Sequence, residues 1–347
     1  MFSKQKLPLW LIKIFNYEYW TWWVFFLPLA PYWMYLAFRN RSLTYFTTVN
    51  PCIPDGGVFG ESKKDILDLI DKSYRPADIF VFKGENWEHV KLKLTLAKIN
   101  FPVVAKPDVG GRGFKVYKLE TPEALKTYLE ASSQPVIVQE FIDYDIELGV
   151  MYARMPNASS GQITSIVHKE FLHITGDGKS TVEQLLSQNL RARFSMDELR
   201  ERLKEQWHTV PKKGETMFLQ PIGNHCLGTK FLNGNHLINE QLVKVFDKIA
   251  IPIDGFYYGR FDLKVPTWED LYEGRNIKIL ELNGATSEPG HVYDPNYTLW
   301  KAYRDIMYNM KTVADISAYN MRRGIRPTPL RELIQTSRTF FAMSGQL

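Results

Sequence analysis

Two short strand-like runs near residue 270 each carry a pair of polar side chains separated by one apolar residue. The first run contains Arg260 and Asp262, and the second contains Glu281 and Asn283. Strand side chains alternate between two faces, so each pair shares one face, with its members about 6 to 7 Å apart. Carboxylate and amide oxygens suit Mg²⁺, which proteins usually hold with one or two carboxylates while phosphates and water complete the coordination. The pattern therefore predicts a site for a metal and a nucleotide.

A lysine followed by a glycine-rich turn supplies a second part of this chemistry. The apolar run 101–105 leads to Lys106, and the turn 108–113 follows. The residues of this turn that could face a phosphate are Gly110, Gly111, Arg112 and Gly113. Glycines let backbone N–H groups approach phosphate oxygens, and Lys106 with Arg112 would supply positive charge. A glycine-rich hairpin without a ligand has the same pattern, so that interpretation stays open.

The run 135–147 is typical of a buried strand that continues into a polar connection. Gln139 and Glu140 end the strand, and the backbone of the two residues that follow, Phe141 and Ile142, could bind the edge of an adenine. A carboxylate at Glu147 could accept hydrogen bonds from both ribose hydroxyls, because an ionised carboxylate is only an acceptor. These residues indicate a nucleotide hinge, and a simple connection between domains is the alternative.

Helices and strands alternate along the part of the chain that must position these residues. Capping residues predict helices that begin after Ser62 and Thr121, and a capping box from Ser180 to Glu183 predicts a third. Strand-like runs lie at 101–106, 135–139, 148–153 and 163–167. The alternation predicts an α+β or α/β domain.

Composition limits the class of protein. The 347 residues are enough for two domains, and the net charge of +5 fits anionic substrates or an anionic membrane surface. This charge is too weak to indicate nucleic acid, and no nucleic-acid motif is present. Cys52 and Cys226 are the only cysteines and lie far apart, so neither a disulfide framework nor a zinc site is predicted. A reducing cytoplasm fits this usage best.

The segment 19–38 is apolar, aromatic and free of charge. It is nominally long enough to cross a bilayer, but Pro28 and Pro31 disfavour a straight helix. Basic residues flank both ends of the segment, which favours cytoplasmic placement of both. We therefore expect a re-entrant or monotopic anchor at the cytoplasmic face of the inner membrane. A single span and an aromatic core element of a soluble cytoplasmic protein are the alternatives.

The same features divide the chain into four parts. We expect a membrane-associated segment at 1–50, a hinge at 51–60, a catalytic domain at 61–310 and a basic C-terminal helix or tail at 311–347. Five arginines mark the last part: Arg322, Arg323, Arg326, Arg331 and Arg338. They could touch anionic lipid, but a solvated helix face is the simpler interpretation and the one we favour.

The order of these motifs resembles that of the ATP-grasp ligases over residues 61–295. The resemblance rests on the strand ending at Lys106, the glycine-rich turn, the hinge with Glu147, and the two metal strands. It implies an α+β fold of two subdomains that hold ATP and Mg²⁺, with Mn²⁺ as an alternative. The implied roles are phosphate binding by Lys63 (or Lys64) and Lys106, ribose binding by Glu147, and metal binding by Asp262, Glu281 and Asn283.

Two subfamilies are similar to different stretches. The run 259–262 resembles D-alanine–D-alanine ligases, which implies that Arg260 stabilises a tetrahedral intermediate. The runs 175–183 and 221–228 resemble cyanophycin synthetase and the ATP-grasp part of bifunctional glutathione synthetases. Lys169 stands in the place of a further phosphate-binding lysine.

Two departures from the family bear on the substrate. The aromatic segment stands where these ligases usually have an α/β domain that helps to bind the first substrate. The loop 283–291 is longer than in the D-alanine ligases, so its acceptor-site candidates are Ser287, Glu288 and His291. For His291, as for His168 and His173, a histidine without a catalytic task is the simpler interpretation.

The resemblance implies a carboxylate–amine ligase that works through an acylphosphate. We expect small-molecule or lipid-linked carboxylate and amine substrates, and a membrane-held substrate in particular, because tethering raises local concentration. A kinase that phosphorylates a hydroxyl is the first alternative, and a non-catalytic nucleotide sensor at the membrane is the second.

Overall fold

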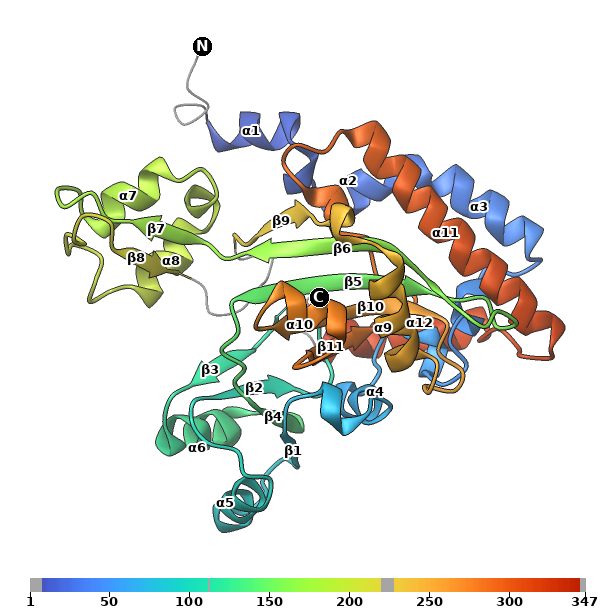
Figure 1. The fold of residues 1–347 in the computed structure, drawn as a ribbon, viewed down its shortest axis with the longest axis horizontal. Coiled ribbons are helices and arrows are strands. Elements are labelled where there is room, and N and C mark those ends of the chain that lie inside the picture. Colours follow the sequence, from blue (N-terminus) through green and yellow to red (C-terminus); the bar gives the residue numbers. More distant parts are fainter. Residues whose placement is uncertain (1–7, 112, 220–227, 344–347) are drawn as a thin grey trace.

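The computed structural model describes residues 8–111, 113–219 and 228–343. The strands form a four-stranded sheet in the order β1-β4-β2-β3, a five-stranded sheet in the order β11-β10-β5-β6-β9 and a two-stranded sheet of β7 and β8. Figure 1 shows the four-stranded sheet below the five-stranded one, with helices around both. Sheets and helices thus combine in an α+β fold, as predicted.

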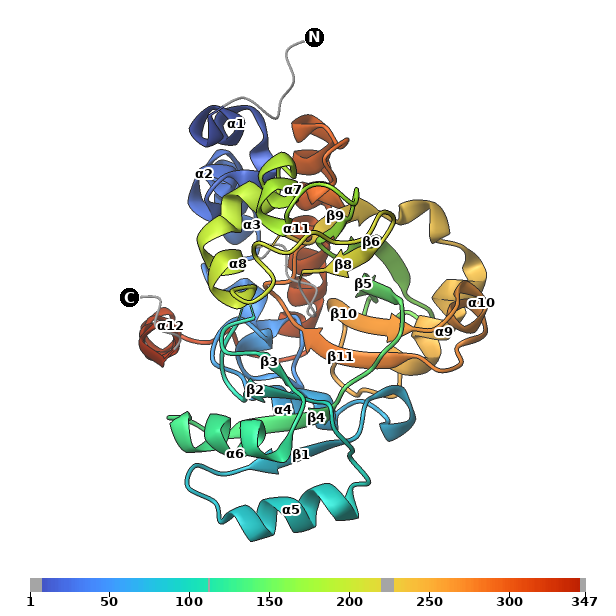
Figure 2. The same ribbon diagram turned by 90° about the vertical axis from the view of Figure 1, so that its left-hand side faces the viewer.

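The four-stranded sheet is covered by helices on its lower side, as Figures 1 and 2 show. Thr121 accepts a hydrogen bond from the N–H of Ala124 and so begins α6 as predicted. The apolar side chains of the sheet and of the helices α5 and α6 form one core. The elements are β1 (Asp78–Val81), β2 (Val103–Pro107), β3 (Tyr117–Leu119), β4 (Val136–Glu140), α5 (Trp87–Leu96) and α6 (Pro122–Ala131).

The five-stranded sheet is buried on both faces, because successive side chains of its central strands enter different cores. On β5, Val150 and Tyr152 pack with α4, α9 and α10, whereas Met151 and Ala153 pack with α3 and α11. The strands are β5 (Ile146–Ala153), β6 (Gln162–Glu170), β9 (Lys230–Asn233), β10 (Tyr258–Val265) and β11 (Lys278–Asn283). The helices are α3 (Ala30–Arg39), α4 (Lys63–Asp68), α9 (Glu240–Ala250), α10 (Trp268–Glu273) and α11 (Leu299–Arg322).

A smaller module with its own apolar core projects from the end of β6. It consists of β7 (His173–Thr175), β8 (Thr216–Phe218), α7 (Val182–Gln188) and α8 (Met196–Arg202). The predicted capping box is wrong by one position, since Thr181 and Gln184 form it instead. Ser180 is bound by the Asp177 carboxylate through its backbone N–H and its hydroxyl, which makes it part of the preceding turn.

The aromatic N-terminal segment forms short helices: α1 (Leu9–Phe15), α2 (Trp22–Phe26) and α3. The predicted break is present, with a 3₁₀ turn at Leu27–Leu29 that contains Pro28 and with Pro31 in the first turn of α3. Within the described residues, no helix combines the length and the apolar character needed to cross a membrane. Leu36 and Ala37 are buried against α11. Part of the segment therefore belongs to the core, as one alternative expected.

Two observations concern the C-terminal part of the predicted division. Helix α11 runs through position 310, so the predicted boundary there falls inside a helix. Helix α12 (Leu330–Met343) follows, and its Phe340 and Phe341 rings contact Phe59 from the predicted hinge. The α12 arginines, Arg331 and Arg338, lie on the exposed side, which agrees with a solvated face.

Asn50 joins the N-terminal segment to the five-stranded sheet and is completely buried. Its amide nitrogen donates to the carbonyl oxygens of Tyr258 at 2.7 Å and Gly56 at 3.2 Å. Its amide oxygen accepts from the backbone N–H groups of Tyr257 and Tyr258, both at 2.9 Å. One side chain therefore satisfies four backbone groups. Three of them lie at the start of β10, the strand that carries Arg260 and Asp262, and the fourth is the Gly56 carbonyl.

Replacing Asn50 by alanine is expected to lower the free energy of unfolding by about 3 kcal/mol or more, because each buried polar group left without a partner costs about 1 to 3 kcal/mol. Urea denaturation followed by tryptophan fluorescence measures this loss. The matched control is Asn157→Ala, at an exposed position, for which a change within about 0.5 kcal/mol is expected. Equal losses in the two variants would contradict the role of Asn50.

Candidate active site

The two predicted metal strands are neighbours in the five-stranded sheet. β10 and β11 pair antiparallel, with Asp262 opposite Glu281 and Arg260 opposite Asn283. The register shifts immediately after Asp262, and such bulges are frequent beside active sites because they redirect a side chain. Four side chains predicted from two separate runs thus come together on one surface.

Asp262 is the centre of this group. Its Oδ2 accepts hydrogen bonds from Arg260 Nε at 3.1 Å, Arg260 Nη2 at 2.9 Å and Asn283 Nδ2 at 3.0 Å. Burial alone would raise the pKa of Asp262, but Arg260 and Lys169 lower it below its ordinary value. Arg260 is therefore joined to the metal residues by Asp262, whereas the sequence suggested that it acts apart from them.

Lys169 and Glu147 reach the same group from β6 and β5. Lys169 Nζ lies 3.0 Å from Glu147 Oε1 and 3.0 Å from Asp262 Oδ1, and all three side chains are buried. Burial would lower the pKa of Lys169, but the carboxylates of Asp262 and Glu147 offset this and raise it. Glu147, predicted to bind ribose, is thus held by the lysine predicted to bind phosphate.

Lys106 approaches this group from the four-stranded sheet. Its Nζ donates to the carbonyl oxygen of Leu280 at 2.9 Å and to Gln139 Oε1 at 3.3 Å. Burial lowers the pKa of Lys106 to about 8, and the opposite charge of Glu281 acts against this shift. The predicted phosphate lysine therefore lies between the two sheets and next to a predicted metal ligand.

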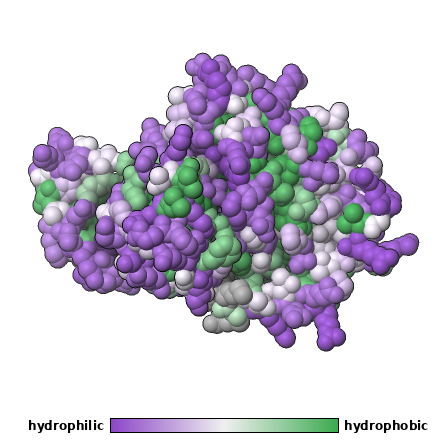
Figure 3. Space-filling model, turned by 90° about the horizontal axis from the view of Figure 1, so that it is seen from below, coloured by the Kyte–Doolittle hydropathy of each residue, from purple (hydrophilic) through white to green (hydrophobic). Residues whose placement is uncertain are grey.

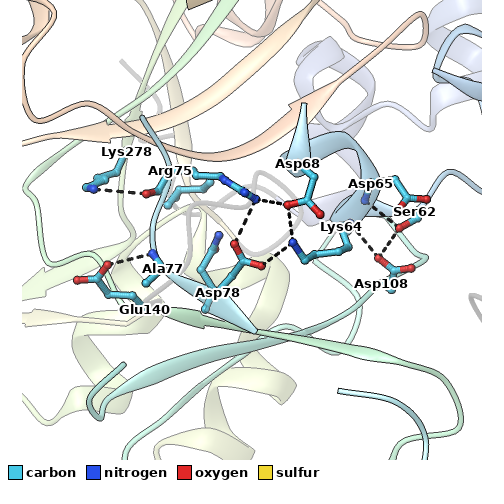
Figure 4. A network of polar contacts seen from close by, with 12 residues as sticks. Ser62, Lys64, Asp65, Asp68, Arg75, Ala77, Asp78, Asp108, Glu140 and Lys278 are labelled. Atoms are coloured by element: carbon cyan, nitrogen blue, oxygen red, sulfur yellow. Dashed lines mark hydrogen bonds and ion pairs between the residues drawn. The ribbon is translucent and has the colours of Figure 1, made fainter. Parts of the chain in front are cut away.

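The structure distinguishes the two adjacent lysines at the start of α4. Lys63 Nζ donates to the carbonyl oxygens of Gly110, in a short contact, and Asp108 at 3.4 Å, so it lies at the glycine-rich turn. Lys64 Nζ instead pairs with Asp68 and Asp78, as Figure 4 shows. Gly113 has φ of +71°, a left-handed conformation that favours glycine. Arg112 lies outside the described residues.

Asp108, in the glycine-rich turn, fixes the position of α4. Its Oδ1 accepts from the Ser62 hydroxyl and from the backbone N–H of Lys64, both at 3.0 Å. Ser62 caps the helix through the N–H of Asp65, as predicted (Figure 4). The sequence did not indicate the role of Asp108, which only the approach of turn and helix in space creates.

The predicted nucleotide hinge connects the two larger sheets, since residues 141–145 lie between β4 and β5. Glu140 accepts from the backbone N–H of Ala77 at 3.2 Å (Figure 4). The Ile142 carbonyl accepts from Lys264 Nζ at 3.1 Å, and the Phe141 ring lies under Lys118 Nζ at 4.4 Å. Neither Lys118 nor Lys264 was predicted, because lysines in strands carry no motif of their own.

The three acceptor-site candidates after Asn283 have different surroundings. The Ser287 hydroxyl donates to the carbonyls of Asn283 and Gly284 and so shapes the turn. His291 is buried, with Nδ1 2.6 Å from the Ser165 hydroxyl and Nε2 3.1 Å from Asp305 Oδ2, which favours a structural role. Glu288 lies beside Arg260, whose Nη1 donates to the Glu288 carbonyl at 3.4 Å.

The other two histidines have local contacts. His168 packs edge to face on Trp268, and His173 Nδ1 lies 3.0 Å from the carbonyl oxygen of Phe171. These surroundings fit the simpler interpretation of both residues. The run 221–228, used in the resemblance, lies outside the described residues except for Gly228.

The donor set fits magnesium. Asp262 Oδ1 is buried and, within the described residues, no donor bonds it with good geometry, although Lys169 Nζ lies 3.0 Å away. Glu61 Oε2 is likewise buried and has no hydrogen-bond partner among the described residues. Burial and the negative charge of Glu281 raise the pKa of Glu61. A bound cation could accept Asp262 Oδ1 as a ligand and would lower the pKa of the Glu61 carboxyl group. Sequence patterns did not identify Glu61.

The number of acidic ligands is small. Across residues 8–111, 113–219 and 228–343, no three His, Cys, Asp or Glu side chains gather around one point. Asp262, Glu281 and the amide of Asn283 would hold Mg²⁺, and nucleotide phosphates would complete its coordination.

Comparison with known proteins places one part of this site in a family. Residues 82–151, which include Lys106 and the hinge, match the RimK-like ATP-grasp domain. A cyanophycin synthetase from Geminocystis herdmanii is 24% identical over 214 residues, which cover 55% of this chain and 24% of that protein. The chain thus spans about a quarter of the length of this relative. These matches confirm the predicted resemblance to the ATP-grasp ligases.

Solved structures of ligases are also similar, although distantly. A bifunctional glutathione synthetase from Pasteurella multocida matches with a TM-score of 0.38 and 15% identity, over 70% of this chain and 35% of that one. A D-alanine–D-alanine ligase from Bacillus anthracis matches with a TM-score of 0.42 and 13% identity, over 76% and 69% of the two chains.

The pKa of about 8 for Lys106 predicts that ATP binding through this lysine depends on pH. Below pH 8 the lysine already carries its proton, so the Kd for Mg-ATP is expected to be flat there. Above pH 8 the free lysine is largely neutral, so ATP binding must be accompanied by protonation of Lys106. The Kd is therefore expected to increase by up to about tenfold per pH unit. Isothermal titration calorimetry with a non-hydrolysable ATP analogue measures this dependence.

The matched control for this titration is Lys106→Arg, because a guanidinium keeps its charge over the whole range. Its Kd is expected to stay flat above pH 8. If the wild type and the arginine variant follow the same curve, another group is responsible for the pH dependence.

Proposed function

We propose that this ATP-grasp chain is a Mg²⁺-dependent ligase that joins a carboxylate to an amine through an acylphosphate. The observation that carries the proposal is the hydrogen bond of Lys106, from one sheet, to the Leu280 carbonyl of the other. This bond sets Lys106 near the group of Arg260, Asp262 and Lys169. Such a site places positive charge where phosphoryl transfer develops negative charge, and phosphoryl transfer depends mainly on positioning and electrostatics.

The first step would transfer the γ-phosphate of ATP. A carboxylate oxygen of the acid forms a bond to the phosphorus, and the bond from phosphorus to the leaving ADP breaks. Lys63, Lys106 and Lys169 are the chain's own cations for the phosphate oxygens. Bound Mg²⁺ would supply further charge neutralisation from its place at Asp262, Glu281 and Asn283.

In the second step, an amine would attack the carbonyl carbon of the acylphosphate, lose a proton and displace inorganic phosphate. Negative charge gathers on the carbonyl oxygen in the tetrahedral intermediate. Arg260 is suited to stabilise it, because Asp262 fixes Nε and Nη2 while Nη1 makes a long contact of 3.4 Å with the Glu288 carbonyl. A guanidinium so oriented offers Nη1 to an oxyanion with little loss of side-chain entropy.

We further propose that the N-terminal segment docks on the cytoplasmic face of a membrane and that one substrate is held there. Its large apolar side chains remain exposed along α1 to α3: Trp10, Ile14, Phe15, Trp22, Trp23, Leu27, Met34, Tyr35 and Phe38. Aromatic residues of this kind favour the interfacial region of a bilayer. Seen from below, the opposite side of the molecule is largely hydrophilic (Figure 3). The apolar face of α1 to α3 would therefore contact lipid.

Replacing Arg260 by alanine is expected to abolish amide formation and to change the Kd for ATP little, because Arg260 would act on the second step. Losing an oxyanion donor typically costs about 10²- to 10³-fold in rate. Lysates and membrane extracts supplied with Mg-ATP provide the acid and amine, and mass spectrometry identifies the product. Arg260 also neutralises the buried charge of Asp262, so Arg260→Lys is measured together with Arg260→Ala. The lysine variant keeps the positive charge but loses the planar guanidinium, which separates the two effects.

Hydroxylamine in the same assay tests the reaction class. A hydroxamate is expected, because hydroxylamine captures an acylphosphate. A stable phosphate ester instead would make the protein a kinase, and tight ATP binding without ATP consumption would make it a sensor. Unchanged amide formation by Arg260→Ala would contradict the role of the arginine.

The membrane proposal is tested by co-sedimentation with vesicles of phosphatidylcholine and phosphatidylglycerol. Phe15→Ser and Phe38→Ser, at side chains 77% and 85% exposed, are each expected to weaken binding about tenfold, because less apolar area enters the bilayer. Phe218→Ser, at a side chain 70% exposed on β8, is the matched control and is expected to bind like the wild type. Equal losses in all three variants, or no binding by the wild type, would contradict the proposal.

A further inference from the structure

The N-terminal segment touches the loop that follows the metal strand. The indole N–H of Trp22 donates to Glu288 Oε1 at 3.1 Å. Trp22 is 57% exposed, so the same side chain belongs both to the apolar face and to the surroundings of Arg260. A simple tether would not need such a contact, because a tether only has to hold the domain near the membrane.

The loop that carries Glu288 is held at several further points. The Tyr293 hydroxyl donates to Glu288 Oε2, and Arg260 Nη1 reaches the Glu288 carbonyl. Gly290 packs so closely on β6 that an added Cβ would lie 2.7 Å from Val167 Cγ1. The Glu288 side chain is therefore one point at which the N-terminal segment can affect the position of the loop and of Arg260.

The segment from Tyr17 to Phe26 is anchored on both sides of this contact. The Tyr17 hydroxyl donates to the carbonyl oxygens of Val292 at 2.6 Å and Tyr297 at 3.0 Å. Glu18 forms a buried ion pair with Arg191 of the β7–β8 module, and Phe25 is buried against the loop and α11. Buried anchors at both ends fix the segment across the loop and the module.

We propose that residues 17–26 form one wall of the acceptor side of the site, with Trp22 and Glu288 as positioning residues for Arg260. The inference rests on the proposed function and specifies it, because it assigns the amine step to a place between the N-terminal segment and β10. An amine brought by the membrane would meet Arg260 along this wall. Residues 17–26 would then contribute to catalysis even when no membrane is present.

The test compares Trp22→Phe with Trp300→Phe in the absence of vesicles. Trp22→Phe keeps a ring but loses the N–H, while Trp300 is 82% exposed at the start of α11 and serves as the matched control. A membrane lipid extract and free amino acids supply the acid, and hydroxylamine supplies the amine. Positional isotope exchange in ATP, measured without hydroxylamine, reports the first step, and hydroxamate formation reports both.

Trp22→Phe is expected to lower hydroxamate formation about tenfold, the worth of about one hydrogen bond, and to leave isotope exchange unchanged. Trp300→Phe is expected to match the wild type in both measurements. Tyr293→Phe, which removes a further hydrogen bond to the Glu288 carboxylate, should act in the same direction as Trp22→Phe. It decides the outcome if Trp22→Phe fails to fold.

Three results would overturn the inference. The first is hydroxamate formation by Trp22→Phe equal to that of Trp300→Phe, with exchange intact in both, which leaves the proposed ligase reaction standing. The second is an equal loss of exchange and hydroxamate, because this would indicate general damage to the site. The third is a wild type without exchange or hydroxamate, which removes the proposed function and the inference with it.

Discussion

The buried carboxylate of Asp262 is the group on which the arrangement of the site depends. One of its oxygens accepts three hydrogen bonds, from two nitrogens of Arg260 and from Asn283, and the other lies 3.0 Å from Lys169. A buried charge is costly unless it is paired and hydrogen-bonded. Strands β6, β10 and β11 each supply one of these partners. The five-stranded sheet therefore has to form in its correct register before this charge can be buried.

The N-terminal segment supports the same strand from the other end. Asn50 satisfies three backbone groups where β10 begins and the carbonyl of Gly56, and Trp22 donates a hydrogen bond to the loop that follows β11. Buried backbone groups without partners would be expensive, so these polar contacts fix the path of the chain more strictly than apolar packing does. The aromatic segment thus exposes apolar side chains on one side and makes fixed polar contacts with the rest of the protein on the other. Membrane docking and support of the site are compatible tasks for such a segment.

Patterns that depend on local geometry were predictable. Alternation of side chains on strands placed Arg260 with Asp262 and Glu281 with Asn283, and the pairing of β10 with β11 then joined them. Where two local patterns compete, sequence was insufficient: Asp177 takes Ser180 into the turn, so Thr181 becomes the cap. The sequence also could not decide between Lys63 and Lys64, because either lysine could bind a phosphate. The two differ only in their contacts in space, with Lys63 at the glycine-rich turn and Lys64 paired with Asp78.

The amino-acid order alone was enough to predict an α+β domain, the two metal strands, the glycine-rich turn with Lys106 and the hinge, because each depends on residues close together in the chain. Only the tertiary structure joined Lys169 to Asp262, held Glu147 with Lys169, brought Glu61 near Glu281 and set Trp22 against Glu288. Those contacts link residues from different elements, several of them far apart in the chain. Their partners are chosen by sheet register, burial and charge, which no local pattern of residues contains.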